Sequence, residues 1–300
     1  MYVESSYFVT FPERLPVKPR KRYLQYYKDL HARYKLHLDD STLFTGSQYK
    51  FNELVYPIFD KLIADEMLKN IDTMVLTHWA HEFDQDFATL GPHLAFLHNF
   101  NCTMFDVLDQ GSICTMTALS LIEKLNTKKA LCLSMDQTTI PRSDSKIYVI
   151  PTHTASAALC LSREKPENAT LRILHIEIWL ENILCEHKFD VVYLILELLN
   201  HYNIDINDCV LSCKRNSIVY RAINLHKYKY KNFVDGIELN FRPLQSGCTE
   251  IFYFIDQLTI DYKYLSKRYF LYLDEDSESL TSGLIILEAL KVRGLNFYAS

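Results

Sequence analysis

Phe105-Asp-Val-Leu-Asp-Gln-Gly-Ser-Ile-Cys-Thr-Met-Thr-Ala-Leu119 predicts a strand, a tight turn and then a buried helix. Gly111 allows the backbone to bend sharply. The apolar run after it begins a helix whose first free N–H groups point back toward the Ser112 hydroxyl. Many enzymes place a nucleophile at such a turn, so Ser112 is a candidate functional residue. Ser112 can equally be a small residue that fits a crowded turn and caps the following helix.

The same segment resembles the strand-to-helix elbow of β-ketoacyl-ACP synthase III enzymes. In that family, Asp-Val is followed by Gln-Gly-Cys or Ala-Ala-Cys, and an Ala-Leu pair lies six and seven residues after the cysteine. Ala118 and Leu119 keep this spacing from Ser112. Serine therefore occupies the position of the family's cysteine. Cys114 lies two residues too late, on a different face of the helix.

Two segments of the second half resemble the parts of the family that carry its other catalytic residues. Residues 206–218 resemble the strand and turn with His-Gln-Ala-Asn. Cys213 thus takes the place of the histidine, and Asn216, in the place of the asparagine, is the candidate cofactor-binding residue. Residues 246–251 resemble the Gly-Asn or Gly-His pair that opens another helix, and its second member here is Cys248. The candidate catalytic residues are therefore Ser112, Cys213 and Cys248.

Other matching segments also depart from the family's residues. Residues 131–136 resemble the family's next strand, and residues 152–161 resemble its Gly-Asp-Gly-Ala segment, with His153 in place of the aspartate. Residues 269–283 resemble the last hairpin, whose glycine-rich turn lines the oxyanion site. Four acids occupy that turn here and would oppose negative charge unless they point to solvent. These acids are Asp274, Glu275, Asp276 and Glu278.

The order of predicted elements repeats along the chain. Strands are expected at 7–10 and 74–77 with a helix at 54–68, and again strands at 171–178 and 209–212 with helices at 189–202 and 217–225. A polar junction at 165–170 separates the two parts. The resemblance implies an α/β fold, a thiolase-like five-layered αβαβα sandwich of two duplicated halves, residues 1–165 and 166–300. It also implies that both elbows meet at the centre, with Ser112 facing Cys213 and Cys248.

The altered residues bear directly on the expected chemistry. The family's condensation needs a reactive thiolate and a His and Asn that hold the developing enolate. A serine hydroxyl needs an adjacent base, and a cysteine thiol, with an ordinary pKa of about 8.5, is a poor one. We therefore expect a protein that keeps the fold, lacks condensing activity and serves as a non-catalytic or partner subunit in specialised lipid, polyketide or peptide biosynthesis.

Other readings remain open at this point. The alternative function is an acyltransferase in which Ser112 takes an acyl group from acyl-CoA or acyl carrier protein, with His153 or His175 as the base. The resemblance implies acyl-CoA or acyl-carrier-protein partners and a homodimer, or a heterodimer with a catalytically intact homologue. No cofactor is expected.

Composition narrows the function classes. The net charge of −5 and the lack of a sustained basic stripe argue against nucleic acid as a partner. Apolar runs such as 191–199 are much shorter than the roughly 20 residues that cross a membrane. The eight cysteines lack disulfide-type spacing, which indicates reduced thiols and a cytoplasmic protein. The basic segment 18–22 reads as a solvated helix start, with phosphate contact as the alternative.

The sequence gives only weak support for a metal site or a redox-active cysteine pair. His78, His81, Asp84 and Asp86 follow a predicted strand but lack a recognised ligand spacing, so a polar loop is expected there rather than a metal site. Cys213 and Cys248 could form a redox pair or bind a soft metal. Buried inert thiols are the more ordinary reading.

Overall fold

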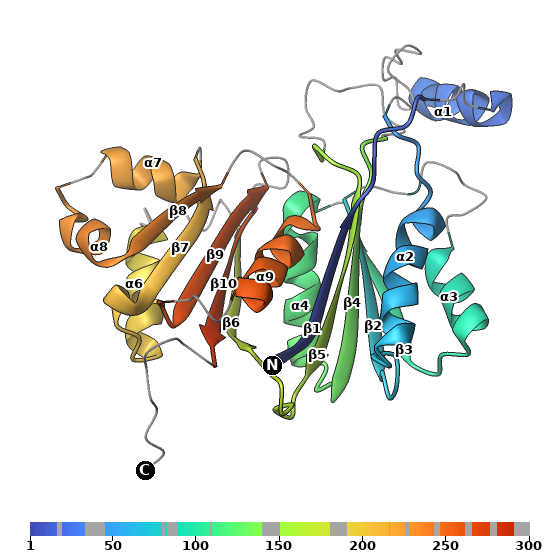
Figure 1. The fold of residues 1–300 in the computed structure, drawn as a ribbon. Coiled ribbons are helices and arrows are strands. Elements are labelled where there is room, and N and C mark those ends of the chain that lie inside the picture. The colour runs from blue at the N-terminus through green and yellow to red at the C-terminus, as the bar shows by residue number, and fades with distance from the viewer. Residues whose placement is uncertain are drawn as a thin grey trace.

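The computed structural model shows one ten-stranded sheet made of two halves, with three layers of helix packed on their faces (Figure 1). Its elements run from β1 near the N-terminus to β10 near the C-terminus. The structure describes residues 1–16, 20–33, 46–79, 82, 89–108, 110–139, 151–180, 191–215, 217–225, 228–242, 247–261, 266–276 and 281–290.

Five strands form the first half-sheet, in the order β3-β2-β4-β5-β1. β2 pairs in parallel with β3 and β4, whereas β5 runs antiparallel to both β4 and β1. β2 and β4 are buried along almost their whole length, as expected for their nearly continuous apolar sequences. The strands are β1 (Tyr2–Thr10), β2 (Thr73–His78), β3 (Thr103–Leu108), β4 (Lys129–Asp136) and β5 (Ala155–Ser162).

The second half-sheet repeats the first strand for strand, in the order β8-β7-β9-β10-β6. β7 pairs in parallel with β8 and β9, and β10 runs antiparallel to β9 and β6. A short β1–β6 pairing joins the two halves. Both the order and the strand directions are therefore duplicated. The strands are β6 (Leu171–Leu180), β7 (Cys209–Lys214), β8 (Glu238–Arg242), β9 (Tyr269–Asp276) and β10 (Thr281–Ala289).

Two helices lie between the half-sheets and form the central layer, α4 (Cys114–Lys124) after β3 and α9 (Glu250–Asp261) after β8. They occupy equivalent places in the two halves. One core joins this layer to both sheets, with Met116 and Phe252 on the helices, Cys132 on β4 and Ile285 on β10. Because α4 follows β3 and α9 follows β8, the C-terminal ends of these two strands lead to the N-terminal ends of the central helices.

Separate cores attach the outer helices. Helices α2 (Phe51–Ala64) and α3 (Leu90–His98) cover the outer face of the first half-sheet, and Leu54, Ile58 and Leu62 of α2 are fully buried there. On the second half-sheet lie α6 (Val191–His201), α7 (Ile218–Leu225) and α8 (Lys231–Gly236). Three layers of helix and the two half-sheets give the five-layered arrangement that the resemblance implies.

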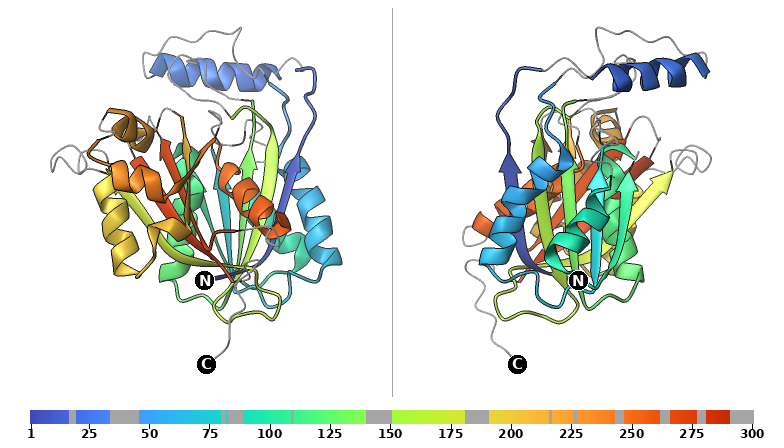
Figure 2. Two further views of the ribbon diagram at one scale, coloured as in Figure 1. Left: turned by 60° about the vertical axis from the view of Figure 1, so that its left-hand side comes forward. Right: turned by 90° about the vertical axis from the view of Figure 1, so that its right-hand side faces the viewer.

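The remaining helices are short or lie outside this body. Figure 2 shows α1 (Lys21–Arg33) lying beyond the ends of the strands. Tyr23 and Tyr27 are buried on one face of α1, while most of the positions around them are exposed, which agrees with a helix start at the basic segment; Lys18 lies outside the described residues. Two single turns of 3₁₀ helix, η2 (Gly111–Ile113) and η3 (Ile206–Asp208), precede α4 and β7.

The predicted strands and helices are present with shifted ends. The helix predicted at 54–68 is α2, which begins three residues earlier and ends at Ala64. The helix predicted at 189–202 is α6, and the junction predicted at 165–170 falls between β5 and β6. Within the described residues, no helix is both long enough and apolar enough to cross a membrane. The seven cysteines in those residues are free thiols.

Candidate functional site

The turn that joins β3 to α4, which we call the first elbow, consists of Gly111, Ser112 and Ile113. Gly111 has a φ of +54°, a left-handed conformation that favours glycine. Ser112 is only 5% exposed. Its hydroxyl donates to the backbone carbonyl of Glu275 over 3.4 Å, which is at the long end for such a bond. Ser112 therefore lies at the predicted turn and points toward β9 of the other half.

The first elbow packs tightly against a carboxylate. A Cβ added to Gly111 would clash with the carboxyl group of Asp276, the last residue of β9. Glycine is required here both by its φ value and by this contact.

The second elbow, Gly247, Cys248 and Thr249 before α9, repeats this arrangement. A Cβ on Gly247 would clash with the carboxyl group of Asp136, the last residue of β4. Asp136 accepts hydrogen bonds from the backbone N–H of Cys248 at 2.9 Å, and from the N–H and hydroxyl of Thr249 at 2.8 and 2.6 Å. β4 and β9 are equivalent strands, so each half provides an aspartate that lies against the elbow of the other.

Cys248 is a buried thiol within this second elbow. Its Sγ donates to Oδ1 of Asp136 at 3.0 Å, and its carbonyl accepts a 2.6 Å hydrogen bond from Thr115 of α4. Burial, followed by the charge of Asp136, raises the pKa of the thiol well above its ordinary value. Cys248 is therefore held as a neutral thiol between the two central helices.

Cys213 lies on the other face of its sheet. Side chains of β7 alternate, and Leu211 and Cys213 belong to the outer core beneath α6 and α7, whereas Val210 belongs to the core of the central layer. Burial raises the pKa of the Cys213 thiol. The structure thus does not place Cys213 facing Ser112 as we expected, because a one-residue step along a strand reverses the side chain's direction. Asn216 lies outside the described residues.

The residue that reaches the central layer from β7 is Lys214. Its Nζ lies 2.6 Å from Oδ1 of Asp274 on β9 and 3.8 Å from Oε2 of Glu250 at the start of α9. Arg242, at the end of β8, donates to Glu250 at 2.5 Å and to the hydroxyl of Tyr272 at 2.6 Å. The Arg242 guanidinium carbon also lies 3.8 Å from the centroid of the Tyr272 ring. We call Lys214, Arg242, Glu250, Tyr272 and Asp274 the ionic cluster.

The ionic cluster is almost fully excluded from solvent, since none of its residues is more than 8% exposed. Two cations face two carboxylates, so its formal charges cancel. Burial, followed by the charge of Asp274, raises the pKa of Glu250 to about 7. For Asp274 burial opposes ionisation, but Lys214 and Arg242 outweigh it and lower the pKa of that carboxyl. Burial and nearby carboxylates raise the pKa of the Tyr272 hydroxyl, which stays protonated.

The acids expected in the last hairpin turn need a correction. Asp274, Glu275 and Asp276 belong to β9 and pair with Gly283, Ser282 and Thr281 of β10. Asp274 neither points to solvent nor presents a free charge, because Lys214 compensates it. Glu278 lies outside the described residues.

The histidines considered from the sequence have ordinary structural surroundings. His153 is exposed in the segment before β5. His78 is buried at the end of β2, where its ring stacks on Phe51 at 4.4 Å. His175 lies between Glu177 at 3.1 Å and the hydroxyl of Tyr202 at 3.0 Å, in the outer part of the second half. His81, Asp84 and Asp86 lie outside the described residues.

Sequence reasoning did not single out Lys214, Arg242, Glu250 or Asp136. A usable signal was present, because Lys214, Arg242 and Asp136 are each the last residue of a strand. The carboxyl ends of parallel strands meet at one edge of a sheet.

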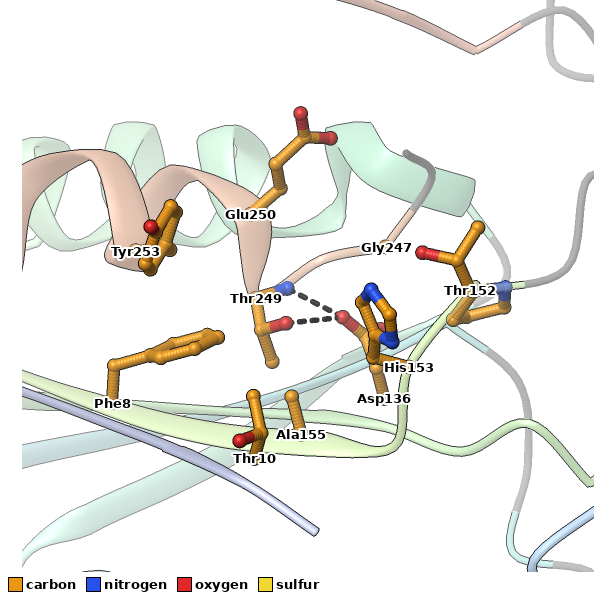
Figure 3. A pocket seen from close by; sticks show the side chains of 11 residues that line it. Phe8, Thr10, Asp136, Thr152, His153, Ala155, Gly247, Thr249, Glu250 and Tyr253 are labelled. Carbon is orange, nitrogen blue, oxygen red and sulfur yellow. Dashed lines mark hydrogen bonds between the residues drawn. The ribbon is translucent and has the colours of Figure 1, made fainter. Parts of the chain in front are cut away.

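A cavity of about 250 Å³ opens beside the second elbow (Figure 3). Thr249 and Gly247 line one side, and Phe8 and Ala155 of the first half-sheet line the other. This cavity lies against α9, beside the elbow that carries Cys248, one of the residues that the resemblance marks as catalytic.

Comparisons with known proteins identify the fold. No protein-family model matches the chain, and no curated protein matches it. Among solved structures, the tetronic acid condensing enzyme AbyA1 superimposes with a TM-score of 0.61 at 13% identity, over 96% of this chain and 100% of that one. OleA of Xanthomonas campestris gives 0.59 at 11% identity, over 96% and 98%.

The 3-oxoacyl-(acyl carrier protein) synthase III, FabH, of Xanthomonas oryzae pv. oryzae gives a TM-score of 0.58 at 12% identity, over 96% of this chain and 98% of that one. Such low identity establishes the common fold and leaves the activity to be argued from the site. The expectation drawn from the resemblance is thus confirmed: the chain has the thiolase-like α/β fold of 3-oxoacyl-ACP synthase III.

Proposed function

We propose that this protein is a thiolase-fold protein without condensing activity, which serves as a non-catalytic partner subunit in an acyl-assembling system. The observation that carries the proposal is the contact between Gly111 and Asp276 at the first elbow. A carboxylate from the other half packs directly against the backbone of the residue before Ser112, and we infer that it leaves no room for an acyl group on residue 112.

The electrostatics of the elbows support this proposal. N–H groups at a helix N-terminus attract negative charge, and acyl transfer needs such donors about 2.7–3.1 Å from the developing oxyanion. At the second elbow the N–H groups of Cys248 and Thr249 already donate to Asp136. At the first elbow Asp276 places a carboxylate against Gly111, the residue before Ser112. Both carboxylates oppose an oxyanion.

The surroundings of Ser112 also disfavour the alternative acyltransferase. The hydroxyl donates to the Glu275 carbonyl, which accepts a hydrogen bond but takes up no proton. A serine nucleophile needs an imidazole or amine base in that place. Lys214, a cation on β7, is instead paired with Asp274. Loss of a positioned base costs about two to four orders of magnitude in rate.

Partner and substrate class follow from the proposed role. Solved proteins of this fold include enzymes named as a tetronic acid condensing enzyme and a 3-oxoacyl-(acyl carrier protein) synthase III. We propose that acyl-CoA or an acyl carrier protein is the ligand of the complex and not of this chain alone. β3 forms one edge of the described sheet and leaves room for a second subunit, either the same chain or a catalytically intact homologue. The protein is proposed to act in the cytoplasm.

The test is intact-protein mass spectrometry after incubation with a panel of acyl-CoA thioesters and acylated carrier protein. We expect no adduct on the wild type or on Ser112→Ala. A hydroxylamine-sensitive acyl adduct on the wild type alone would instead establish the acyltransferase. Native mass spectrometry of the protein purified from its own cells then tests the partner: a complex with a homologue that retains Cys, His and Asn is expected, and a monomer would contradict the subunit role.

A further inference from the structure

The cavity beside the second elbow has no role in the proposed function, and its two ends differ in character (Figure 3). Phe8 of β1 and Tyr253 of α9 lie at one end, with ring centroids 5.0 Å apart. Asp136 and His153 lie at the other end. Thr249 lies between the two ends of the cavity, and its hydroxyl donates a hydrogen bond to Asp136. The cavity therefore suits a ligand with an apolar body and one polar end.

The polar end favours a cation over an anion. Asp136 is fully buried, and burial raises its pKa. Its four hydrogen bonds all come from donors, namely the N–H groups of Cys248 and Thr249, the Thr249 hydroxyl and the Cys248 thiol. These donors fill the four acceptor sites of the carboxylate, so Asp136 attracts a cation in the cavity through its charge and not through a direct hydrogen bond. These bonds also occupy the N–H groups that would otherwise attract an anion.

The remaining wall strengthens this preference. The described residues that line the cavity include no lysine or arginine, and Glu250, which also lines it, is already paired with Arg242. Thr10 and Thr152 line it as well and are exposed at its mouth. Their hydroxyl oxygens accept hydrogen bonds from an ammonium group.

The volume of the cavity limits how many atoms the ligand can have. A protein cavity of about 150 Å³ holds one benzene molecule, with six non-hydrogen atoms. A cavity of about 250 Å³ by the same measure holds about ten. This matches one aromatic ring with a short aminoalkyl chain.

We propose that this cavity binds a small primary amine with an aromatic or compact alkyl body. The body packs against the contacting rings of Phe8 and Tyr253, and the ammonium group lies at the end lined by Thr152 and His153, within reach of the charge of Asp136. Binding involves no covalent step and is independent of whether the first elbow accepts an acyl group.

The test uses 2-phenylethylamine as the probe, with 2-phenylethanol and 3-phenylpropionate as neutral and anionic controls of similar size. Titration calorimetry and ligand-observed NMR on the full chain measure binding. A ligand of this size with ordinary efficiency has a Kd on the order of 1 mM. The amine is expected to bind at least tenfold more tightly than the alcohol, and the carboxylate not to bind. Equal affinities, or preference for the carboxylate, would overturn the proposal.

Variants locate the site. Ala155 is 2% exposed and its methyl group lines the cavity, so Ala155→Ile should abolish binding by filling it. Tyr253, 45% exposed, can be truncated with little effect on folding, and Tyr253→Ala should weaken binding at least fivefold. Phe96→Ala is the matched control, because Phe96 is an exposed aromatic residue on α3, outside the cavity. Unchanged binding in both cavity variants, with unaltered circular dichroism, would refute this location.

Placing a positive or a negative side chain at position 153, at the mouth of the cavity, tests the preference for a cation without altering the core. His153 is exposed, so both His153→Lys and His153→Glu should fold normally. A unit charge about 7 Å away in water-like surroundings changes affinity about threefold. We expect the lysine variant to weaken amine binding by this factor and the glutamate variant to strengthen it. The same change in both variants, or none, would contradict an ammonium at this end.

Discussion

The ionic cluster makes a quantitative prediction for Lys214→Met. Lys214 Nζ and Asp274 Oδ1 are 2.6 Å apart, with side chains only 10% and 1% exposed. At an effective dielectric constant of about 20 this attraction is worth about 6 kcal/mol. Part of this lost attraction is offset, because Lys214 no longer has to be desolvated and because Arg242 still stabilises the charge of Asp274. We expect a net loss of about 3–5 kcal/mol in the free energy of unfolding, the range found when one partner of a buried ion pair is removed.

A double-mutant cycle in urea, followed by circular dichroism and tryptophan fluorescence, measures this coupling. Asp274→Asn alone leaves an uncompensated Lys214, whereas Lys214→Met with Asp274→Asn restores neutrality and keeps an acceptor for the Glu275 N–H. The double variant should therefore be more stable than either single variant, with a coupling energy of at least about 2 kcal/mol. Lys69→Met, at an exposed pair with Glu66, should leave the urea midpoint unchanged. Additive losses in the cycle would refute the account of the cluster.

Further predictions concern pH and the two elbows. The folded-state pKa of Glu250 lies at about 7, above its ordinary value of 4.5, so its contribution to stability is full below about pH 4.5 and is lost as the pH rises through 7. This amounts to about 3 kcal/mol; Glu250→Gln should flatten that fall in urea titrations between pH 5 and 8, and an unchanged slope would contradict it. Gly111→Ala should lower the free energy of unfolding by about 1–3 kcal/mol because of its φ of +54° and the contact with Asp276. Adding Asp276→Ala should recover the steric part, and a double variant no more stable than Gly111→Ala would show that Asp276 does not contribute.

Local patterns in the sequence predict the strands and helices, and the resemblance to β-ketoacyl-ACP synthase III implies how they assemble into five layers. Residues 131–136 and 209–212 are largely apolar, as expected for buried strands, and the repeated order of strands and helices agrees with the duplicated halves. The turn at Gly111 is marked by a glycine between an apolar strand and an apolar helix. These signals depend on neighbouring residues, so one sequence is enough to read them.

The site depends on strand register and on contacts between distant segments, which local sequence patterns do not determine. Cys213 and Lys214 are adjacent, and only the register of β7 decides which of them faces the central layer. About thirty residues of chain separate Lys214 from Arg242, and about as many separate Arg242 from Asp274. The three side chains meet only because the ends of their strands are aligned. The contacts of Asp136 and Asp276 with opposite elbows become apparent only once the two halves are placed face to face.

The most direct test of the central claim, that the first elbow is closed to acyl groups, is the acylation of Ser112→Cys. This variant supplies the thiol that the resemblance associates with condensing enzymes, and intact mass after incubation with acyl-CoA reports its modification. We predict no acyl adduct on Ser112→Cys and its appearance only when Asp276→Gly is added, because the carboxylate that packs on Gly111 is then removed. Acylation of Ser112→Cys alone would contradict the claim, since it would show an open elbow limited only by its serine.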